Sequence, residues 1–568
     1  QVSNAVANVD YAAFSFPWVQ TLFGSTNANS TSTLMGFTGG FYSLASSTIG
    51  NGNQNGGLTI SGGATTTGNA YFTGNVGIGT FTPSQKLQVV GNIIANNIAN
   101  VNCQAGYTVT GFDGSGNIVC AVVPTASTTA SNIKSFGFGH GASYGSAYFT
   151  TADGQVFGTG YNANYELGQG DTTNRGFAFS IPLPAGKYAS STVAFNNGAF
   201  AVHTDGTVSA WGYNANGQLG LGDTVVRTSP QLIPTLSNVK KIVTTSYGST
   251  GLTVPTVCAL TTAGSLYCWG YNAYGQVGDY TTTQRTSPVL VATTTGVLVD
   301  VVATGEQYGD ICAINSTGAL YCWGYNGYGQ IGNYTTTNQL FPQQVATTSG
   351  TIASVNLGGT GSTQYTCAVN TSGSLYCWGY NAQGNLGDYS ATQRLFPVNV
   401  ATTSGTIVKT FNGGGSTYVT NCALNSTGQL WCAGYNGYGQ LGDYSVTARS
   451  NFRQVATSTG TIVQWEEVGT GSYGTSCVLN NIGQVYCWGY NATGGAATGG
   501  TASPVYGALP TAVGGLNNIV ELASTGYTNT GTFCARSGSG QVKCWGYNDY
   551  GEVGAGNTAA FVYSEPTT

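Results

Sequence analysis

The residues best placed to do chemistry in this sequence are its fourteen cysteines, which all fall into pairs. Such pairs can bind a metal or form disulfides. A zinc site needs four clustered ligands, usually at shorter cysteine spacing or with histidines, and the chain has only His140 and His203. We therefore expect no metal and no cofactor, and seven disulfides. Six pairs repeat one spacing, and the seventh lies upstream: Cys258 with Cys268, Cys312 with Cys322, Cys367 with Cys377, Cys422 with Cys432, Cys477 with Cys487, Cys534 with Cys544, and Cys103 with Cys120.

Each repeated pair brackets a stretch that predicts a β-hairpin. Folding residues 258–268 about their middle places Leu260 opposite Leu266 and Cys258 opposite Cys268. Gly264 then takes the third position of a three-residue loop, where a left-handed conformation is needed. Directly opposed strand residues are close enough for a disulfide. Because disulfides persist in oxidising compartments, we expect an extracellular or cell-surface protein.

Tyrosines form a second repeated set. The tetrapeptide Trp-Gly-Tyr-Asn, or a close variant, begins at Thr159, Trp211, Trp269, Trp323, Trp378, Ala433, Trp488 and Trp545. Tyrosines that pack between repeats, with the hydroxyl at the rim, are one interpretation. A recognition face for protein or carbohydrate is the other, because tyrosine gives a large contact area at low entropic cost. The residues concerned are Tyr271, Tyr325, Tyr380, Tyr435, Tyr490 and Tyr547.

Catalytic patterns are weak in this chain, and we expect no enzyme. Residues 141–145 match G-x-S-x-G, but that motif requires a strand-to-helix turn in an α/β fold. The adjacent pair Glu466 and Glu467 has no recognisable partner acid, so we expect a solvated strand edge. Aspartates that follow a repeated glycine, such as Asp279, are explained as turn-capping residues. Asn-x-Ser/Thr sites at Asn315, Asn370 and Asn425 are expected to lie beside hairpin turns and to be accessible to glycosylation.

Composition excludes further classes of function. Charged residues make up only 6 % of the chain, and the formal net charge is −5. Nucleic-acid binding needs a dense basic face, so we expect no nucleic-acid partner. No apolar run is long enough to span a bilayer as a helix, so we expect no transmembrane segment. The chain starts at Gln1, and its only methionine is Met35. We interpret this as a mature form from which a leader has been removed.

The tyrosine tetrapeptide recurs roughly every 55 residues, a period typical of propeller blades. Short strands and Gly-rich turns surround each copy, and no unit has the 3.6-residue apolar period of a helix. Each unit exposes an apolar face, so the units must stack and close into a ring. The sequence therefore predicts an all-β, closed propeller of eight blades, with seven as the alternative, preceded by a small β-rich stalk domain.

The repeat, written Cys-Ala-Leu-x-x-x-Gly-x-Leu-Tyr-Cys-Trp-Gly-Tyr-Asn-x-Tyr-Gly-Gln-x-Gly, resembles that of the regulator-of-chromosome-condensation propellers, in a bacterial cysteine-rich version. The resemblance covers about residues 131–568. Members are mostly seven-bladed and often have a histidine two residues before the position of the first cysteine, where this chain has residues such as Thr256 and Asp310. Their functions include nucleotide exchange on a small GTPase, chromatin docking and inhibition of a secreted β-lactamase, so the fold does not choose the function.

The N-terminal part differs from the repeats. Residues 74–93 resemble a short segment of phage tail-fibre and bacterial surface-fibre proteins, which implies a β-rich shaft. Residues 5–23 are apolar and aromatic and must be buried, either in their own chain or by self-assembly with a neighbouring subunit. We expect 1–56 to be an apolar segment with a Gly/Asn linker, 57–123 a stalk with a disulfide, 124–130 a linker and 131–568 the propeller. The candidate assembly residues are Val9, Tyr11, Phe14, Phe16 and Trp18.

Two functions from different classes remain open at this point. The first is an extracellular structural surface protein, either a filament subunit or a fibre component that displays the propeller. The second is a secreted binding module, such as an adhesin, a carbohydrate-binding protein or a protein inhibitor, that uses one propeller face.

Overall fold

The computed structural model describes residues 133–567, apart from short gaps, and four strands before them. The gaps are 141–144, 246–253, 293–295, 306, 347–349, 362, 401–404, 414–417, 457–459, 469–472, 493, 497–505, 528–529 and 555–561. The chain divides into two units, Gln1–Val101 and Asn102–Thr568. Residues 5–23, with the candidate assembly residues, lie outside the described part of the chain.

Two short sheets precede the propeller. In the first unit, β1 (Val76–Ile78) pairs in parallel with β2 (Leu87–Val89). In the second unit, β3 (Tyr107–Phe112) and β4 (Ile118–Val122) form an antiparallel pair. The four strands agree with β structure in this part of the chain, while the fibre resemblance stays a prediction.

Eight four-stranded antiparallel sheets follow, and each is built from four consecutive strands. The eight-blade prediction is confirmed, and the seven-blade alternative is wrong. Blades 1 to 4 are β5 (Ile133–His140), β6 (Gly145–Thr151), β7 (Val156–Gly160) and β8 (Arg175–Ile181); β9 (Ala189–Phe195), β10 (Gly198–His203), β11 (Val208–Gly212) and β12 (Arg227–Leu232); β13 (Val239–Thr244), β14 (Thr256–Thr261), β15 (Leu266–Gly270) and β16 (Arg285–Leu290); β17 (Leu298–Thr304), β18 (Asp310–Asn315), β19 (Leu320–Gly324) and β20 (Gln339–Gln344).

Blades 5 to 8 repeat the same order. They are β21 (Ile352–Gly358), β22 (Tyr365–Asn370), β23 (Leu375–Gly379) and β24 (Arg394–Val400); β25 (Ile407–Asn412), β26 (Thr420–Asn425), β27 (Leu430–Gly434) and β28 (Arg449–Gln454); β29 (Ile462–Val468), β30 (Thr475–Asn480), β31 (Val485–Tyr490) and β32 (Tyr506–Ala512); β33 (Ile519–Tyr527), β34 (Thr530–Ser537), β35 (Val542–Tyr547) and β36 (Val562–Thr567).

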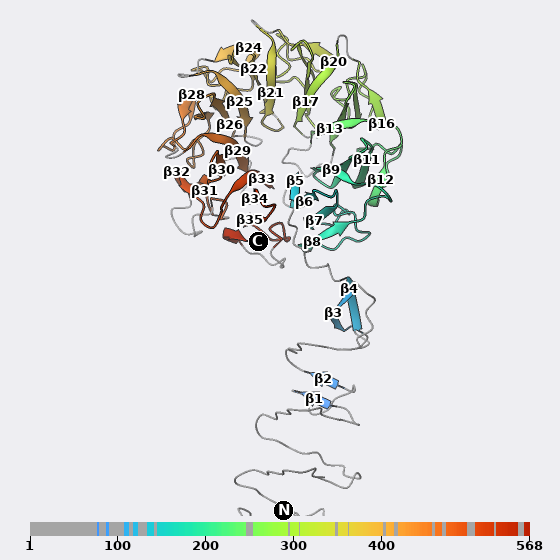
Figure 1. Ribbon diagram of the computed structural model, residues 1–568. Helices are drawn as coiled ribbons and strands as arrows, with labels where there is room; N and C mark the ends of the chain where they lie inside the picture. The colour runs from blue at the N-terminus through green and yellow to red at the C-terminus, as the bar shows by residue number, and fades with distance from the viewer. Residues whose placement is uncertain are drawn as a thin grey trace, which may run out of the picture. The chain divides into compact units, whose positions relative to one another are not determined.

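The blades stand around a ring with the first strand of each blade innermost and the fourth strand at the outer rim (Figure 1). The ring closes where β33 of blade 8 contacts β5 of blade 1. Each of these two end blades is made of its own four consecutive strands. The seam between them includes a hydrogen bond from the Thr159 hydroxyl of blade 1 to the carbonyl oxygen of Gly551 in blade 8, at 2.8 Å.

Antiparallel order within each blade divides the loops between two faces of the propeller. Connections from the first strand to the second and from the third to the fourth lie on one face. The hairpins between the second and third strands lie on the opposite face, together with the connections from blade to blade. We call these the tyrosine face and the hairpin face.

The hairpin register is as predicted. Leu260 pairs with Leu266 and Cys258 with Cys268, and Gly264 has a φ of 81°. Each cysteine pair of this repeat joins the two central strands of one blade. A disulfide therefore closes a hairpin and leaves the blade boundaries to non-covalent contacts.

Six of the seven predicted disulfides form, with Cα atoms 4.1–4.2 Å apart. They join Cys258 to Cys268, Cys312 to Cys322, Cys367 to Cys377, Cys422 to Cys432, Cys477 to Cys487, and Cys534 to Cys544. The seventh pair, Cys103 and Cys120, lies outside the described side chains. The bond between these two cysteines therefore stays a prediction.

A buried tryptophan lies at most blade boundaries and contacts both blades. The six tryptophans of the repeated tetrapeptide are 1 % exposed or less. Each indole Nε1 donates to a backbone carbonyl of the preceding blade; Trp323, for example, donates to Gln276 at 2.9 Å. Gly278, two residues after that carbonyl, lies directly against the indole ring. Each indole ring is therefore packed between two sheets, and its buried N–H group has a hydrogen-bond acceptor.

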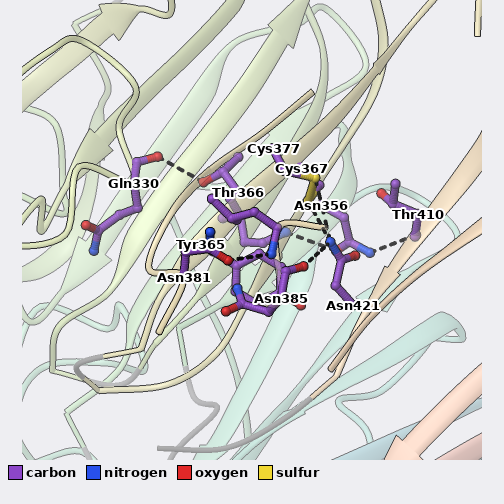
Figure 2. The surroundings of a disulfide bond; sticks show 12 residues. Gln330, Asn356, Tyr365, Thr366, Cys367, Cys377, Asn381, Asn385, Thr410 and Asn421 are labelled. Atoms are coloured by element: carbon purple, nitrogen blue, oxygen red, sulfur yellow. Dashed lines mark hydrogen bonds between the residues drawn. A yellow bond between two sulfur atoms is a disulfide. The ribbon is translucent and has the colours of Figure 1, made fainter. Parts of the chain in front are cut away.

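Blade 6 has Ala433 in place of this tryptophan, and Figure 2 shows the replacement contacts. The carbonyl oxygen of Asn385 in blade 5 accepts a hydrogen bond from Asn421 Nδ2 at 3.0 Å. The same Nδ2 lies 3.1 Å from Cys367 Sγ and 3.6 Å from Cys377 Sγ. One asparagine thus supplies the missing donor and also contacts the disulfide of the neighbouring blade.

Candidate functional site: a tyrosine face

The tyrosine loops are held by an asparagine. In blade 3, β15 ends at Gly270, which has a φ of 94° and lies so close to the carbonyl oxygen of Pro255 that a Cβ would clash. Asn272 is buried in the loop that follows. Its Nδ2 donates to the carbonyl oxygens of Thr281 and Thr283, and its Oδ1 accepts the backbone N–H of Val277.

An ion pair closes the same loop. Asp279 accepts hydrogen bonds from the backbone N–H and hydroxyl of Thr281, and it pairs with Arg285. Asp388 with Arg394 and Asp443 with Arg449 repeat this arrangement. The aspartates are therefore turn-capping residues, as predicted, and the loops that carry the tyrosines are rigidly organised.

Tyrosines meet across blade boundaries on this face. Among the described residues, the second tyrosine of one loop packs edge-on against the first tyrosine of the next blade at four boundaries. Ring centroids are 5.3 Å apart for Tyr274–Tyr325, 5.6 Å for Tyr328–Tyr380, 5.4 Å for Tyr438–Tyr490 and 5.4 Å for Tyr550–Tyr161. Edge-to-face geometry is the favoured arrangement for aromatic pairs. The interpretation that these tyrosines pack between repeats therefore holds for the part of each ring that contacts the neighbouring blade.

Three further tyrosines lie on this face in the loops between the first and second strands, and two of them enlarge these boundary clusters. Tyr308 contacts Tyr274 and Tyr325, with centroids 5.3 and 5.0 Å apart. Tyr473 contacts Tyr438 and Tyr490 at 5.2 and 4.7 Å in the same way. The third, Tyr418, packs against Tyr435 at 4.2 Å. The face therefore presents clusters of three tyrosines at some boundaries and pairs at others.

The rings remain partly open to solvent. All six predicted face tyrosines are half-buried, and Tyr473 is 37 % exposed. Burial raises the pKa of five of them, and neighbouring tyrosine hydroxyls add to the effect; these are Tyr271, Tyr325, Tyr380, Tyr435 and Tyr490. The pKa of Tyr547 is raised by burial and by the Asp549 carboxylate, to which its hydroxyl donates at 2.5 Å. The tyrosines are thus uncharged at neutral pH, and they make the face aromatic and rich in hydrogen-bond donors.

Other candidates from the sequence fall outside this face or differ from expectation. His203 is buried in blade 2, where Nε2 lies 2.8 Å from the Ser209 hydroxyl. The G-x-S-x-G stretch connects two antiparallel strands, β5 and β6, and residues 141–144 lie outside the described part of the chain.

Two expectations about exposure were wrong. Glu466 and Glu467 lie in the innermost strand β29, not at a solvated edge, and burial raises the pKa of Glu467 to about 8. The Asn-x-Ser/Thr asparagines are 3 %, 4 % and 1 % exposed. Their Oδ1 atoms accept the backbone N–H groups of their own turns, as Asn315 does for Thr317 and Ala319. The amides are not accessible to glycosylation in the folded blade. The three sites are Asn315, Asn370 and Asn425.

Sequence reasoning missed two features of the loops. Tyr280, Tyr334, Tyr389 and Tyr444 are exposed, with φ between 63° and 67°; their recurrence after the repeated Gly-Asp or Gly-Asn was visible in the sequence. Asp310 is fully buried at the position that Thr256 fills in blade 3. Burial raises the pKa of Asp310 well above the usual range for a carboxyl.

The fold and the face together define the class of this protein. It is an eight-bladed repeat propeller with a disulfide in each of six blades and tyrosine clusters on one face. Residues 205–253, 263–309 and 317–363 match the Regulator of chromosome condensation (RCC1) repeat. These three stretches lie within blades 2 to 5, and the match therefore shows RCC1-type repeats in this part of the propeller.

Several known proteins are similar to this chain. The Ultraviolet-B receptor UVR8 of Arabidopsis thaliana is 28 % identical over 56 % of this chain and 70 % of its own length. The human E3 ubiquitin-protein ligase HERC2 is 28 % identical over 61 % of this chain, but only 7 % of HERC2 is covered. Among solved structures, human WBSCR16 has a TM-score of 0.46 at 18 % identity, covering 64 % of this chain and 93 % of that one. Prp20p of Saccharomyces cerevisiae has a TM-score of 0.46 at 19 % identity, covering 63 % and 84 %.

Proposed function

We propose that this chain is an extracellular surface protein, a fibre component or filament subunit that displays a disulfide-stapled propeller. The observation that carries the proposal is that six consecutive blades, 3 to 8, each contain a disulfide at one and the same position. Such bonds form and persist in oxidising compartments. Among the described residues, no helix is long and apolar enough to cross a membrane. The proposed role is non-catalytic.

Intact cells of the source organism and their medium test the location. An antibody against the propeller is expected to label unpermeabilised cells or the medium, and alkylation followed by mass spectrometry is expected to find the blade cysteines oxidised. Labelling that requires permeabilisation, with alkylated cysteines, would refute an extracellular role.

Electron microscopy of the native material, without an N-terminal tag, tests the structural role. Regular polymers with propellers at a fixed axial repeat would support a filament subunit, and residues 5–23 would be its joint. Discrete particles carried on a stalk would support a fibre component instead. Compact particles with neither a stalk nor a polymer would contradict both forms of the proposal.

The tyrosine face supports a second function for the same molecule, as a binding module for a protein ligand. Half-exposed tyrosine clusters combine apolar area with phenol donors, which is the chemistry of protein recognition surfaces. UVR8 and HERC2 are proteins whose names indicate a receptor and a ligase. Those roles belong to these proteins, and only the use of a propeller face is proposed for this chain.

A photo-crosslinking amino acid at Tyr473 tests this second function, with the same amino acid at Tyr188 as the control. Tyr188 is 56 % exposed and lies in a blade-to-blade connection on the hairpin face. Irradiation of the full chain on intact cells is expected to give one discrete protein adduct from position 473 and none from position 188. Adducts from both positions, or from neither, would exclude the tyrosine face as the binding surface.

A further inference from the structure

At the outer edge of the tyrosine face, the described part of the chain carries four exposed tyrosines that do not belong to the clusters at the blade boundaries. Tyr280, Tyr334, Tyr389 and Tyr444 occupy one equivalent position in blades 3 to 6, and they are 56 %, 58 %, 63 % and 73 % exposed. We call this set the rim tyrosines. Exposed apolar side chains that are grouped on one surface are candidates for an interaction site.

Backbone conformation separates these residues from ordinary surface tyrosines. All four have left-handed φ values between 63° and 67°, a region that residues with a Cβ adopt rarely and at a free-energy cost. Blades 1 and 2 place Gly170 and Gly222 at the same position, with φ values of 86° and 91°. Glycine takes this left-handed conformation without strain in blades 1 and 2. Blades 3 to 6 have a tyrosine there instead, although a tyrosine in this conformation costs free energy. Strain kept at one site is a sign of function.

Contacts with the next blade align the rim tyrosines. The backbone N–H of each donates to the outermost strand of the following blade, as Tyr280 does to Leu340 in β20 at 2.9 Å and Tyr389 to Ser450 in β28 at 2.7 Å. The glycines make the same bond, Gly222 to Thr286 at 2.9 Å. The backbone of each rim tyrosine is therefore fixed to one of the outer strands β20, β24, β28 and β32, which follow one another around the ring (Figure 1).

Ring stacking accounts for only half of the set. Tyr280 stacks on Phe341, with centroids 4.6 Å apart, and Tyr334 on Phe396 at 5.0 Å. The residues that follow the carbonyls bonded by Tyr389 and Tyr444 are Asn451 and Leu509, which offer no ring. The two most exposed rim tyrosines thus hold a strained backbone without an aromatic partner at that position, so internal stability does not explain them.

The rim loops are electrically neutral. In blades 3, 5 and 6 one aspartate and one arginine of each loop form an ion pair. In blade 4 both members change together, to Asn333 and Gln339, so neutrality is kept. Threonine, serine and glutamine hydroxyls and amides lie beside the tyrosines, as in Thr282 and Thr283, which are exposed. Within these loops an anionic ligand would find the arginines already paired, whereas Arg453 in β28 lies outside them and is exposed.

From this arrangement we propose that the rim tyrosines bind a neutral polysaccharide. A sugar ring has an apolar C–H face that stacks on a tyrosine ring and hydroxyls that exchange hydrogen bonds with threonine, asparagine and glutamine. A linear polymer with identical repeating units matches a row of identical platforms, and several weak contacts on one chain add up through effective concentration. A globular partner would instead favour a compact central cluster of anchors.

The double variant Tyr389→Gly with Tyr444→Gly tests this proposal in the full chain. Glycine is the residue that blades 1 and 2 use, so the variant relieves strain, and its melting temperature is expected to be equal to or above that of the wild type. Affinity electrophoresis through hydroxyethylcellulose, laminarin, soluble starch and galactomannan measures binding. At least one of these neutral gels is expected to retard the wild type, and the double variant is expected to bind it roughly tenfold more weakly.

Controls keep the outcome decisive. Tyr188→Ser removes an exposed tyrosine from the hairpin face and is expected to leave retardation unchanged, and alginate gels test for an anionic ligand. The proposal is wrong if no neutral gel retards the wild type, if alginate alone does, or if the double variant is retarded equally. It is also wrong if sedimentation shows that the wild type dimerises through the rim while no gel retards it. None of these results bears on the tyrosine-face crosslink.

Discussion

Acidification is expected to stabilise the propeller, the reverse of ordinary acid denaturation. Glu467 in β29 has an unpartnered Oε2 and lies against the backbone of Gly413 and Gly474. Burial raises its pKa from 4.5 to about 8. A carboxyl whose pKa is higher in the folded state binds its proton more tightly there, so the stability that it contributes is fully present below pH 4.5 and is lost as pH rises through about 8.

The magnitude follows from linkage. The free energy of unfolding falls by about 1.4 kcal/mol per pH step while only the folded state holds the proton. From pH 4.5 to about 8, Glu467 therefore contributes a loss of about 5 kcal/mol, as an upper figure because a charged carboxylate draws in water. Glu552 is 2 % exposed, and burial raises its pKa to about 7, which adds a loss of about 3 kcal/mol. Asp310 acts in the same direction.

The paired loop aspartates set the lower limit of this effect. Burial acts to raise the pKa of Asp279, but hydrogen bonds from Thr281 and Arg285 outweigh it, so the pKa is lowered overall. The stability from such a group is present above its unfolded pKa of about 4 and is lost below it. The melting temperature is therefore expected to be highest near pH 4–5.

Differential scanning calorimetry between pH 4 and pH 9 measures this profile, and Glu467→Gln is the matched variant. Glutamine keeps the shape without a titrating proton, so the variant is expected to lose most of the fall between pH 5 and pH 8 and to be more stable than the wild type at pH 8. A wild-type melting temperature that is flat or rises from pH 5 to pH 8 would refute the reasoning, as would a Glu467→Gln profile identical to that of the wild type.

Three further outcomes concern stability. Trp378→Ala is expected to lower the free energy of unfolding by about 3–5 kcal/mol, measured by denaturant titration, since the indole is fully buried between blades. Asn421→Val is expected to cost about 1–3 kcal/mol in the same assay because the carbonyl of Asn385 loses its donor; an unchanged midpoint would contradict that role. Reduction and alkylation of the six disulfides are expected to lower the melting temperature, each loop contributing somewhat less than about 3 kcal/mol; an unchanged melting temperature would show that the disulfides do not staple the fold.

Local patterns predicted the blades well. The hairpin about Gly264, the pairing of Cys258 with Cys268 and the number of blades all follow from residues close together in sequence. The tyrosine repeat likewise indicated a set of equivalent residues. Its contacts across blade boundaries, such as Tyr274 with Tyr325, were one of two interpretations left open.

Contacts between blades account for what the sequence did not predict. Glu467 looks like a surface residue in its own strand, but its carboxyl group lies against Gly413 and Gly474, and its Oε2 atom is buried there. Asn421 replaces a tryptophan donor that its own blade lacks, and this is visible only once the neighbouring Asn385 carbonyl is placed. The sequence repeat shows which residues occupy equivalent positions in different blades. It does not show which of these residues contact one another across a blade boundary.

The seam between blade 8 and blade 1 has a mechanical consequence. The six described disulfides lock the central hairpins of blades 3 to 8, so tension along the chain can separate these blades but cannot unravel their central hairpins. The seam is held by side-chain contacts, such as Tyr550 against Tyr161, rather than by a shared strand. A pulling experiment should therefore open the ring first at this seam and then release blades one at a time, in steps that lengthen when the disulfides are reduced.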